Sequence, residues 1–128
     1  MKSDIHTRKD IISLVDSFYY RVKTNPIIGP IFTDVVKLDF NLHLPIMYDF
    51  WSTVLLSEQS YSGNPMEVHL KLSTITPLYK THFDEWLSLF IETVDDLFVG
   101  EKAEEAKYRA KNIAGLMQHK IDKTIRQI

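Results

Sequence analysis

Apolar residues recur along most of the chain at helical spacing, three or four positions apart, rather than in the alternation of a strand. We therefore expect an all-α protein. The first helix is predicted to start at Thr7, whose hydroxyl can cap the next turn together with Asp10. It should end at Asn25-Pro26, because the residue before a proline is pushed out of the helical region. Its apolar face is predicted to hold Ile11, Val15, Phe18, Tyr19 and Val22.

The segment after this helix, Ile28-Gly29-Pro30-Ile31-Phe32, is unusually apolar for a loop, so we expect a buried corner. A second helix is predicted over residues 42–56. Pro45 would fall in its first turn, where the missing N–H has no intrahelical partner. One face of this helix is predicted to hold His43, Met47, Phe50, Trp51 and Val54.

Two further long helices are predicted in the second half of the chain, after a turn region at residues 58–65 and a short helical piece at 66–72. The third helix should open at Thr76-Pro77 and end at Gly100 as a left-handed cap. The fourth should run from Glu101 to about Ile125, with small residues that let another helix approach closely. The two apolar faces hold Phe83, Trp86, Leu87, Phe90, Val94 and Leu97, and then Ala103, Ala106, Ala110, Ile113, Ala114, Met117 and Ile121. Periodicity alone fits both an up-down bundle and a globin-like packing.

Composition narrows the class of protein. A chain of 128 residues, 45% of them hydrophobic, predicts one domain spanning residues 1–128 with a core of its own. The absence of Cys excludes thiolate nucleophiles and Cys-ligated zinc, iron–sulfur clusters or haem. Interspersed charges with a net value of −2 predict no nucleic-acid partner. No apolar run reaches about 20 residues and the first ten residues lack the apolar centre of a secretory signal, so we expect a cytoplasmic protein without membrane insertion.

The five histidines are the main candidates for chemistry. His6 and His119 lie among polar neighbours and are expected to be ordinary surface or satisfied core side chains rather than ligands. His82 precedes an aromatic helix face, where an ordinary role and a contact to a cofactor edge both stay open. His43 heads an apolar stripe and His69 lies among aliphatic residues, so each needs a partner. No phosphate loop, hydrolase elbow or di-iron Glu-x-x-His pair is present, and the many aromatic residues either fill a core or wall a flat cofactor such as haem.

Five segments, in order, resemble the truncated haemoglobins, specifically their group III. The similarity spans nearly the whole chain, and its spacing needs no large insertion. It implies a shortened globin fold, a two-over-two helical sandwich around haem b. The segments are Phe18-Tyr19, Ile28-Gly29-Pro30-Ile31-Phe32, His43-Leu44-Pro45-x-Met47-x-Asp49-Phe50-Trp51, Tyr61-x-Gly63-x-Pro65-x-x-x-His69 and Phe83-x-x-Trp86-Leu87.

The resemblance implies a role for each matching residue. His69 would be the proximal ligand of the haem iron, and Tyr19, His43 and Trp86 would line the distal side. Helical phase favours Tyr19 over its neighbour Tyr20 for the distal role, because Tyr20 should face outward. The haem-binding residues would be Phe32, His43, Met47, Phe50, Trp51, His69, Phe83 and Trp86. Tyr61 would order the turn before His69 or reach a propionate, for which Lys71, Lys80 and His82 are further candidates.

Three functional hypotheses follow. In the first, the chain binds O2, NO and CO reversibly at haem, and distal donors hold bound O2 more strongly than CO. In the second, the haem protein oxidises nitric oxide or turns over peroxide. This activity needs an external reductase, because 128 residues leave no room for a flavin domain; rapid mixing of the oxygenated protein with nitric oxide distinguishes it. In the third, the chain is a haem-free helical module that binds a protein partner.

Overall fold

The computed structural model describes residues 2–35, 39–57 and 79–126, with side chains placed for residues 2–34, 39–57 and 79–119. All the secondary structure in these residues is helical, which confirms the all-α prediction. The elements are α1 (Arg8–Thr24), the single π-helical turn η1 (Ile31–Val35), α2 (Phe40–Leu56), α4 (Lys80–Leu97) and α5 (Glu101–Arg126). The predicted turn at 58–65 and helical piece at 66–72 lie outside the described residues.

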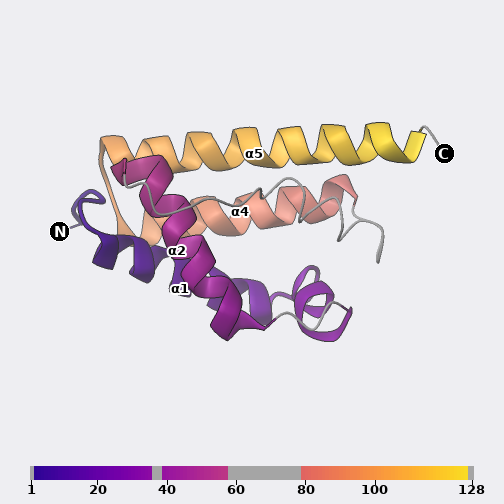
Figure 1. The fold of residues 1–128 in the computed structure, drawn as a ribbon, viewed down its shortest axis with the longest axis horizontal. Helices are drawn as coiled ribbons and strands as arrows, with labels where there is room; N and C mark the ends of the chain where they lie inside the picture. Colours follow the sequence, from indigo (N-terminus) through magenta and orange to yellow (C-terminus); the bar gives the residue numbers. More distant parts are fainter. Residues whose placement is uncertain (1, 36–38, 58–78, 127–128) are drawn as a thin grey trace.

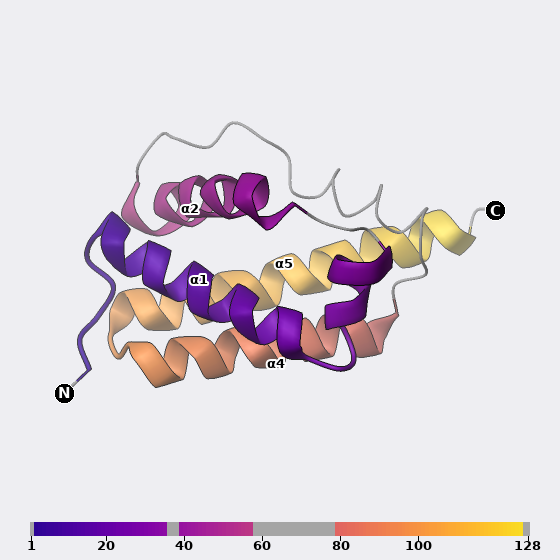
Figure 2. The same ribbon diagram turned by 90° about the horizontal axis from the view of Figure 1, so that it is seen from below.

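The helices form two antiparallel pairs. α1 lies beside α2 and α4 lies beside α5, with the members of each pair running in opposite directions (Figures 1 and 2). α1 also packs against α4 and thereby joins the two pairs, whereas α2 touches α5 only over a short stretch. This arrangement is the two-over-two sandwich that the resemblance implied. None of the described helices combines the length and apolarity needed to cross a lipid bilayer.

The two ends of α1 are where the sequence predicts them. The Thr7 hydroxyl accepts a hydrogen bond from the Asp10 backbone N–H at 3.3 Å, and the Asp10 carboxylate accepts one from the Thr7 N–H at 3.1 Å. Asn25 ends the helix in an extended conformation. The buried face is wider than the predicted stripe, because α1 packs against both α2 and α4. It holds Ile11, Leu14, Val15, Phe18, Tyr19 and Val22.

The apolar corner after α1 is buried at Ile28 and Ile31, as predicted. Gly29 allows this corner to pass close to the end of α1. A Cβ atom at this position would lie only 2.7 Å from the backbone oxygen of Lys23. Such a contact is shorter than real Cβ atoms tolerate, so the close approach requires glycine.

The start of α2 differs from the prediction. Asp39 caps the helix by accepting a hydrogen bond from the Asn41 backbone N–H at 3.0 Å, so α2 begins at Phe40 rather than at residue 42. Pro45 consequently lies in the second turn of α2, and the expectation that it falls in the first turn was wrong. Because proline has no N–H, the helix lacks the hydrogen bond that residue 45 would otherwise donate to the Asn41 carbonyl.

The start of α4 is also later than predicted. Tyr79 is extended, with φ −109° and ψ 167°, and its backbone N–H donates to Nδ1 of His82 at 3.0 Å. The helix therefore begins at Lys80, and the predicted opening at Thr76-Pro77 was wrong. The His82 imidazole thus accepts a hydrogen bond from the backbone N–H of Tyr79, a donor at the start of the helix that would otherwise bond to water.

Gly100 does not cap α4, because that helix already ends at Leu97. The predicted left-handed cap was therefore wrong, and Gly100, with a φ of +145°, precedes the start of α5 instead. The carboxylate of Asp4 accepts hydrogen bonds from the backbone N–H groups of Lys102 and Ala103, both at 2.9 Å. A Cβ atom at Gly100 would overlap the Asp4 side chain. The N-terminal segment is thereby fastened to α5.

Asp4 is expected to make stability depend on pH. Burial alone would raise its pKa, but hydrogen bonds from the backbone of Lys102, Ile5 and Ala103 hold the pKa below its usual value of 3.8. A lowered folded-state pKa adds stability above the unfolded-state pKa, and this contribution is lost as the pH falls below about 4. Asp4→Ala should cost about 1 kcal/mol at pH 7, measured by urea denaturation. Asp4→Asn keeps an acceptor but not the titration, so below about pH 4 its stability should decline less steeply than that of the wild type; a parallel decline would contradict the assignment.

The core lies where α1, α2 and α4 meet, and Phe90 is at its centre. Its side chain is 1% exposed and contacts the rings of Phe18, Trp51 and Trp86. α5 closes the core with buried alanines, which lets its backbone come close to its neighbours, as predicted. The buried residues of α5 are Ala103, Ala106, Ala110, Ala114 and Met117.

Candidate functional site

A polar pair links α1 and α2 inside this largely apolar interface. Tyr19 Oη and His43 Nε2 lie 2.9 Å apart, with the two rings at 85°. Tyr19 is 7% exposed, whereas Tyr20 is 69% exposed. The prediction that Tyr19 faces inward and Tyr20 outward is therefore confirmed. The fold brings together two of the three residues predicted for the distal side.

Burial sets the protonation of Tyr19 in this pair. It raises the pKa of the Tyr19 hydroxyl above its ordinary value of 10, so the hydroxyl stays protonated at neutral pH. The direction of the hydrogen bond depends on the His43 tautomer. When Nε2 carries a proton it donates to the Tyr19 oxygen, and the phenolic proton is then free for a third group. In the other tautomer the phenol donates to Nε2.

Aromatic rings fix the orientation of Tyr19. Phe18 meets its ring at a centroid distance of 5.0 Å, and Phe40 meets it at 6.2 Å, both edge to face. The Lys23 ammonium lies 4.3 Å from the centroid of the Phe40 ring. Sequence analysis missed Phe40. Its spacing of three residues from His43, on the same helix, was the available signal.

Trp86 lies one ring away from the polar pair. It meets Phe18 edge to face at 5.6 Å and stacks on Phe90 at 5.9 Å with an angle of 12°. No hydrogen bond or ring contact joins Trp86 to Tyr19 or His43 among the described residues. Its indole N–H likewise has no hydrogen-bond partner there. Trp86 is half-buried, so this donor remains available to another group.

The residues predicted to wall a cofactor divide into two sets. Trp51 and Phe83 are 4% and 8% exposed, and Trp51 stacks on Phe90 at 4.8 Å, so it belongs to the closed core. Phe32, Met47 and Phe50 pack on the edge of the core but remain half-buried. Half-buried apolar side chains at the edge of the core, together with the part-buried Tyr19–His43 pair, suit a flat apolar ring that binds a small polar ligand. The described part of the candidate site therefore fits haem.

Comparison with known proteins decides the fold family. The "Group 3 truncated hemoglobin ctb" of Campylobacter jejuni is 29% identical over 126 residues, which cover 96% of this chain and 97% of that protein. The crystal structure of the group III truncated haemoglobin from Campylobacter jejuni superposes with a TM-score of 0.83 at 28% identity. This match covers 94% of this chain and 95% of that chain.

The chain has the fold of a group III truncated haemoglobin. The predicted resemblance and the shortened globin fold are thereby confirmed. No family model matches the chain.

The remaining histidines of this truncated-globin chain have simpler surroundings. His6 and His119 are exposed. His82 caps α4 through the Tyr79 N–H, and Lys80 pairs with Asp84 at 2.7 Å. The predicted proximal ligand and two propionate candidates lie outside the described residues. These are His69, Tyr61 and Lys71.

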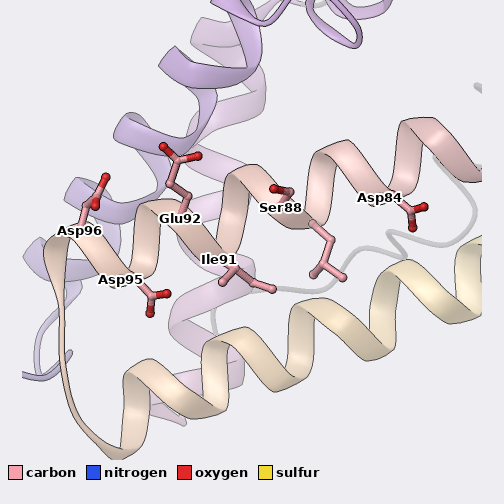
Figure 3. A pocket seen from close by; sticks show the side chains of 7 residues that line it. Asp84, Ser88, Ile91, Glu92, Asp95 and Asp96 are labelled. Carbon is pink, nitrogen blue, oxygen red and sulfur yellow. The ribbon is translucent and has the colours of Figure 1, made fainter.

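A shallow acidic groove on the solvent side of α4 is separate from the polar pair. Leu87 and Ile91 form part of its floor. Figure 3 shows Glu92 and Asp96 projecting from one side of α4 and Asp95 from the other. Two of its carboxylates have basic partners on neighbouring helices: Asp96 pairs with Arg21 of α1 at 2.7 Å, and Asp95 with Lys107 of α5 at 2.6 Å. The groove is thus a solvated face whose charges fasten α4 to its neighbours.

Proposed function

We propose that this chain binds haem and, through it, O2 and the other diatomic gases NO and CO. His69 would be the protein ligand of the iron, and Tyr19, His43 and Trp86 would donate hydrogen bonds on the opposite side. The observation that carries the proposal is the part-buried hydrogen bond between the buried Tyr19 and the half-buried His43, together with half-buried apolar side chains at the edge of the core. When bound, haem would supply the iron that takes up the gas.

The chain's own contribution is a set of donors held ready in apolar surroundings. Burying the Tyr19 hydroxyl and part of the His43 imidazole costs free energy that an entirely apolar core would avoid. The raised pKa keeps a proton on Tyr19, and the hydrogen bond to His43 can turn that proton toward a ligand. The indole N–H of Trp86, which has no hydrogen-bond partner among the described residues, would be a further donor. Since bound O2 carries more negative charge than bound CO, such donors favour O2.

The cofactor would be haem b, held without a covalent bond. The chain has no Cys, so it cannot form the thioether links of a c-type haem. Binding would rely on His69 and on the apolar residues around the ring. From the described residues, Phe32, Met47 and Phe50 would contribute contact area, while Trp51 and Phe83 would support them from the core.

Absorption spectra of the ferric, ferrous and carbonyl forms test this proposal. The purified protein, titrated with haemin, is expected to show a Soret band that saturates at one haem per chain. His69→Ala should change the iron spectrum in all three forms. His119→Ala is the matched control, because His119 is exposed on α5, and it should leave the spectrum unchanged. The absence of a Soret band, or a wild-type iron spectrum in His69→Ala, would refute the proposal.

A further inference from the structure

A second polar link joins α1 and α2 close to the Tyr19–His43 pair. The Tyr48 hydroxyl of α2 donates a hydrogen bond to Oδ1 of Asp16 in α1. Asp16 precedes Tyr19 by three residues, which is about one helical turn. Burial and the neighbouring carboxylate raise the pKa of Tyr48 to about 12, so the phenol keeps its proton at neutral pH. We call this hydrogen bond the Asp16–Tyr48 clasp.

The first turns of α2, which carry His43, need such a restraint. Pro45 follows His43 by two residues and removes one backbone hydrogen bond from this part of the helix. Tyr48 lies three residues beyond Pro45, at the start of the uninterrupted part of α2. The hydrogen bond of Tyr48 therefore holds α2 to α1 immediately after the segment that Pro45 weakens.

An ion pair between Arg8 of α1 and Asp49 of α2 also joins the described parts of these helices, but it lies farther from the polar pair. Arg8 and Asp49 approach to 2.5 Å with side chains that are 40% and 36% exposed. The Asp16–Tyr48 hydrogen bond is exposed to solvent too, so distance from Tyr19, and not burial, distinguishes the two links. Arg8 also precedes Tyr19 by eleven residues, about three turns of α1. Of the two links, the Asp16–Tyr48 clasp is the one beside the polar pair.

We propose that the Asp16–Tyr48 clasp positions α2 on α1 so that His43 Nε2 stays within hydrogen-bond distance of Tyr19. Asp16 and Tyr48 are positioning residues, because they act on the site through the helix that carries His43. The extension to gas binding rests on the proposed function, whereas the effect of the clasp on the Tyr19–His43 hydrogen bond does not.

Nitrogen-15 NMR of the His43 imidazole, recorded on the purified protein, tests the clasp. Tyr48→Phe removes only the hydroxyl. It is expected to move the Nε2 resonance of His43 and to speed exchange of its N–H with water by about threefold, because the bond to Tyr19 is made less often. Asp16→Ala should have the same effect. Asp16→Asn keeps an acceptor oxygen and should restore most of the wild-type signal.

A double-mutant cycle and a control complete the test. The double variant Tyr48→Phe/Asp16→Ala should shift the His43 signal no further than either single variant, because both remove one interaction. Tyr20→Phe, at an exposed tyrosine of α1, should leave the signal unchanged. A lowered melting temperature in Tyr48→Phe with an unchanged His43 signal would overturn the proposal, as would additive shifts in the double variant.

The haem-loaded protein gives a separate readout. Tyr48→Phe is expected to speed O2 dissociation by about threefold, in step with the NMR change. An NMR shift without any change in O2 dissociation would overturn the extension to gas binding and leave the positioning of His43 intact. Failure to bind haem would refute the proposed function alone, since the NMR measurement requires no haem.

Discussion

Tyr19→Phe is expected to speed O2 dissociation from the haem-loaded protein by about 10- to 100-fold. Hydrogen bonds to charged or strongly polarised groups contribute about 1.5–3 kcal/mol, and about 1.4 kcal/mol corresponds to a factor of ten. The substitution removes the protonated hydroxyl of Tyr19 and leaves Nε2 of His43 without the partner it has at 2.9 Å. Dissociation after displacement by CO, followed in a stopped-flow instrument, measures the effect.

Two comparisons separate a lost hydrogen bond from a general disturbance. Tyr20→Phe makes the same chemical change one position along α1, on a side chain that is 69% exposed, and should alter the rate less than about twofold. CO dissociation from Tyr19→Phe should change much less than O2 dissociation, because bound CO carries less negative charge. An equal acceleration for O2 and CO would show that the pocket had merely opened, and would contradict the donor role of Tyr19.

The choice of Tyr19 over Tyr20 could be made from the sequence because helical phase is a local property. A residue 100° around the helix from its neighbour takes a different environment, and the apolar stripe of α1 specifies which of the two is buried. The boundaries of α1 were equally local, since the Thr7 capping box and Asn25-Pro26 act within a few residues. For the same reason the stripes of α4 and α5 were largely predicted.

The first residues of α2 and α4 could not be predicted from local sequence in this way, because a side chain other than the expected one caps each helix. Asp39 and His82 each satisfy a backbone N–H and so set where the helix begins. Proline position alone suggested a later start for α2 and an earlier one for α4. Leu14 and Ser52 are buried although they lie outside the predicted stripes. Their burial depends on which other helix packs against that face, and tertiary packing decides this.

The candidate site shows the same division. The sequence indicated that Tyr19, His43 and Trp86 belong to one region, but the hydrogen bond between the first two depends on how α2 crosses α1. Trp86 instead joins the ring stack of the core, with its N–H unpartnered among the described residues. The position of His69 stays a prediction from sequence, since it lies outside those residues.

Phe90 connects the core to this site. Its ring stacks on Trp51 and Trp86 and meets Phe18, which in turn contacts Tyr19. A single side chain of α4 therefore touches Phe18 of α1, Trp51 of α2 and Trp86, the tryptophan predicted for the distal side. Rigidity of the Tyr19 donor and stability of the fold consequently depend on the same cluster.

Phe90→Ala is accordingly expected to lower the free energy of unfolding by about 4 kcal/mol, which is a large share of the roughly 5–15 kcal/mol of a typical domain. The loss combines transfer of a fully buried ring, the cavity left among three aromatic neighbours and the ring–ring contacts themselves. Urea denaturation followed by circular dichroism gives the value.

Two variants make this measurement decisive. Phe90→Leu retains most of the buried volume and should cost about 1.5 kcal/mol, which gives a measurable transition even when the alanine variant is largely unfolded. Tyr108→Ala removes an aromatic ring that is 65% exposed on α5 and should change stability by less than about 0.5 kcal/mol. A cost for Phe90→Ala below about 1 kcal/mol would mean that the neighbouring rings close the cavity, and that Phe90 does not hold Phe18 and Trp86 in place.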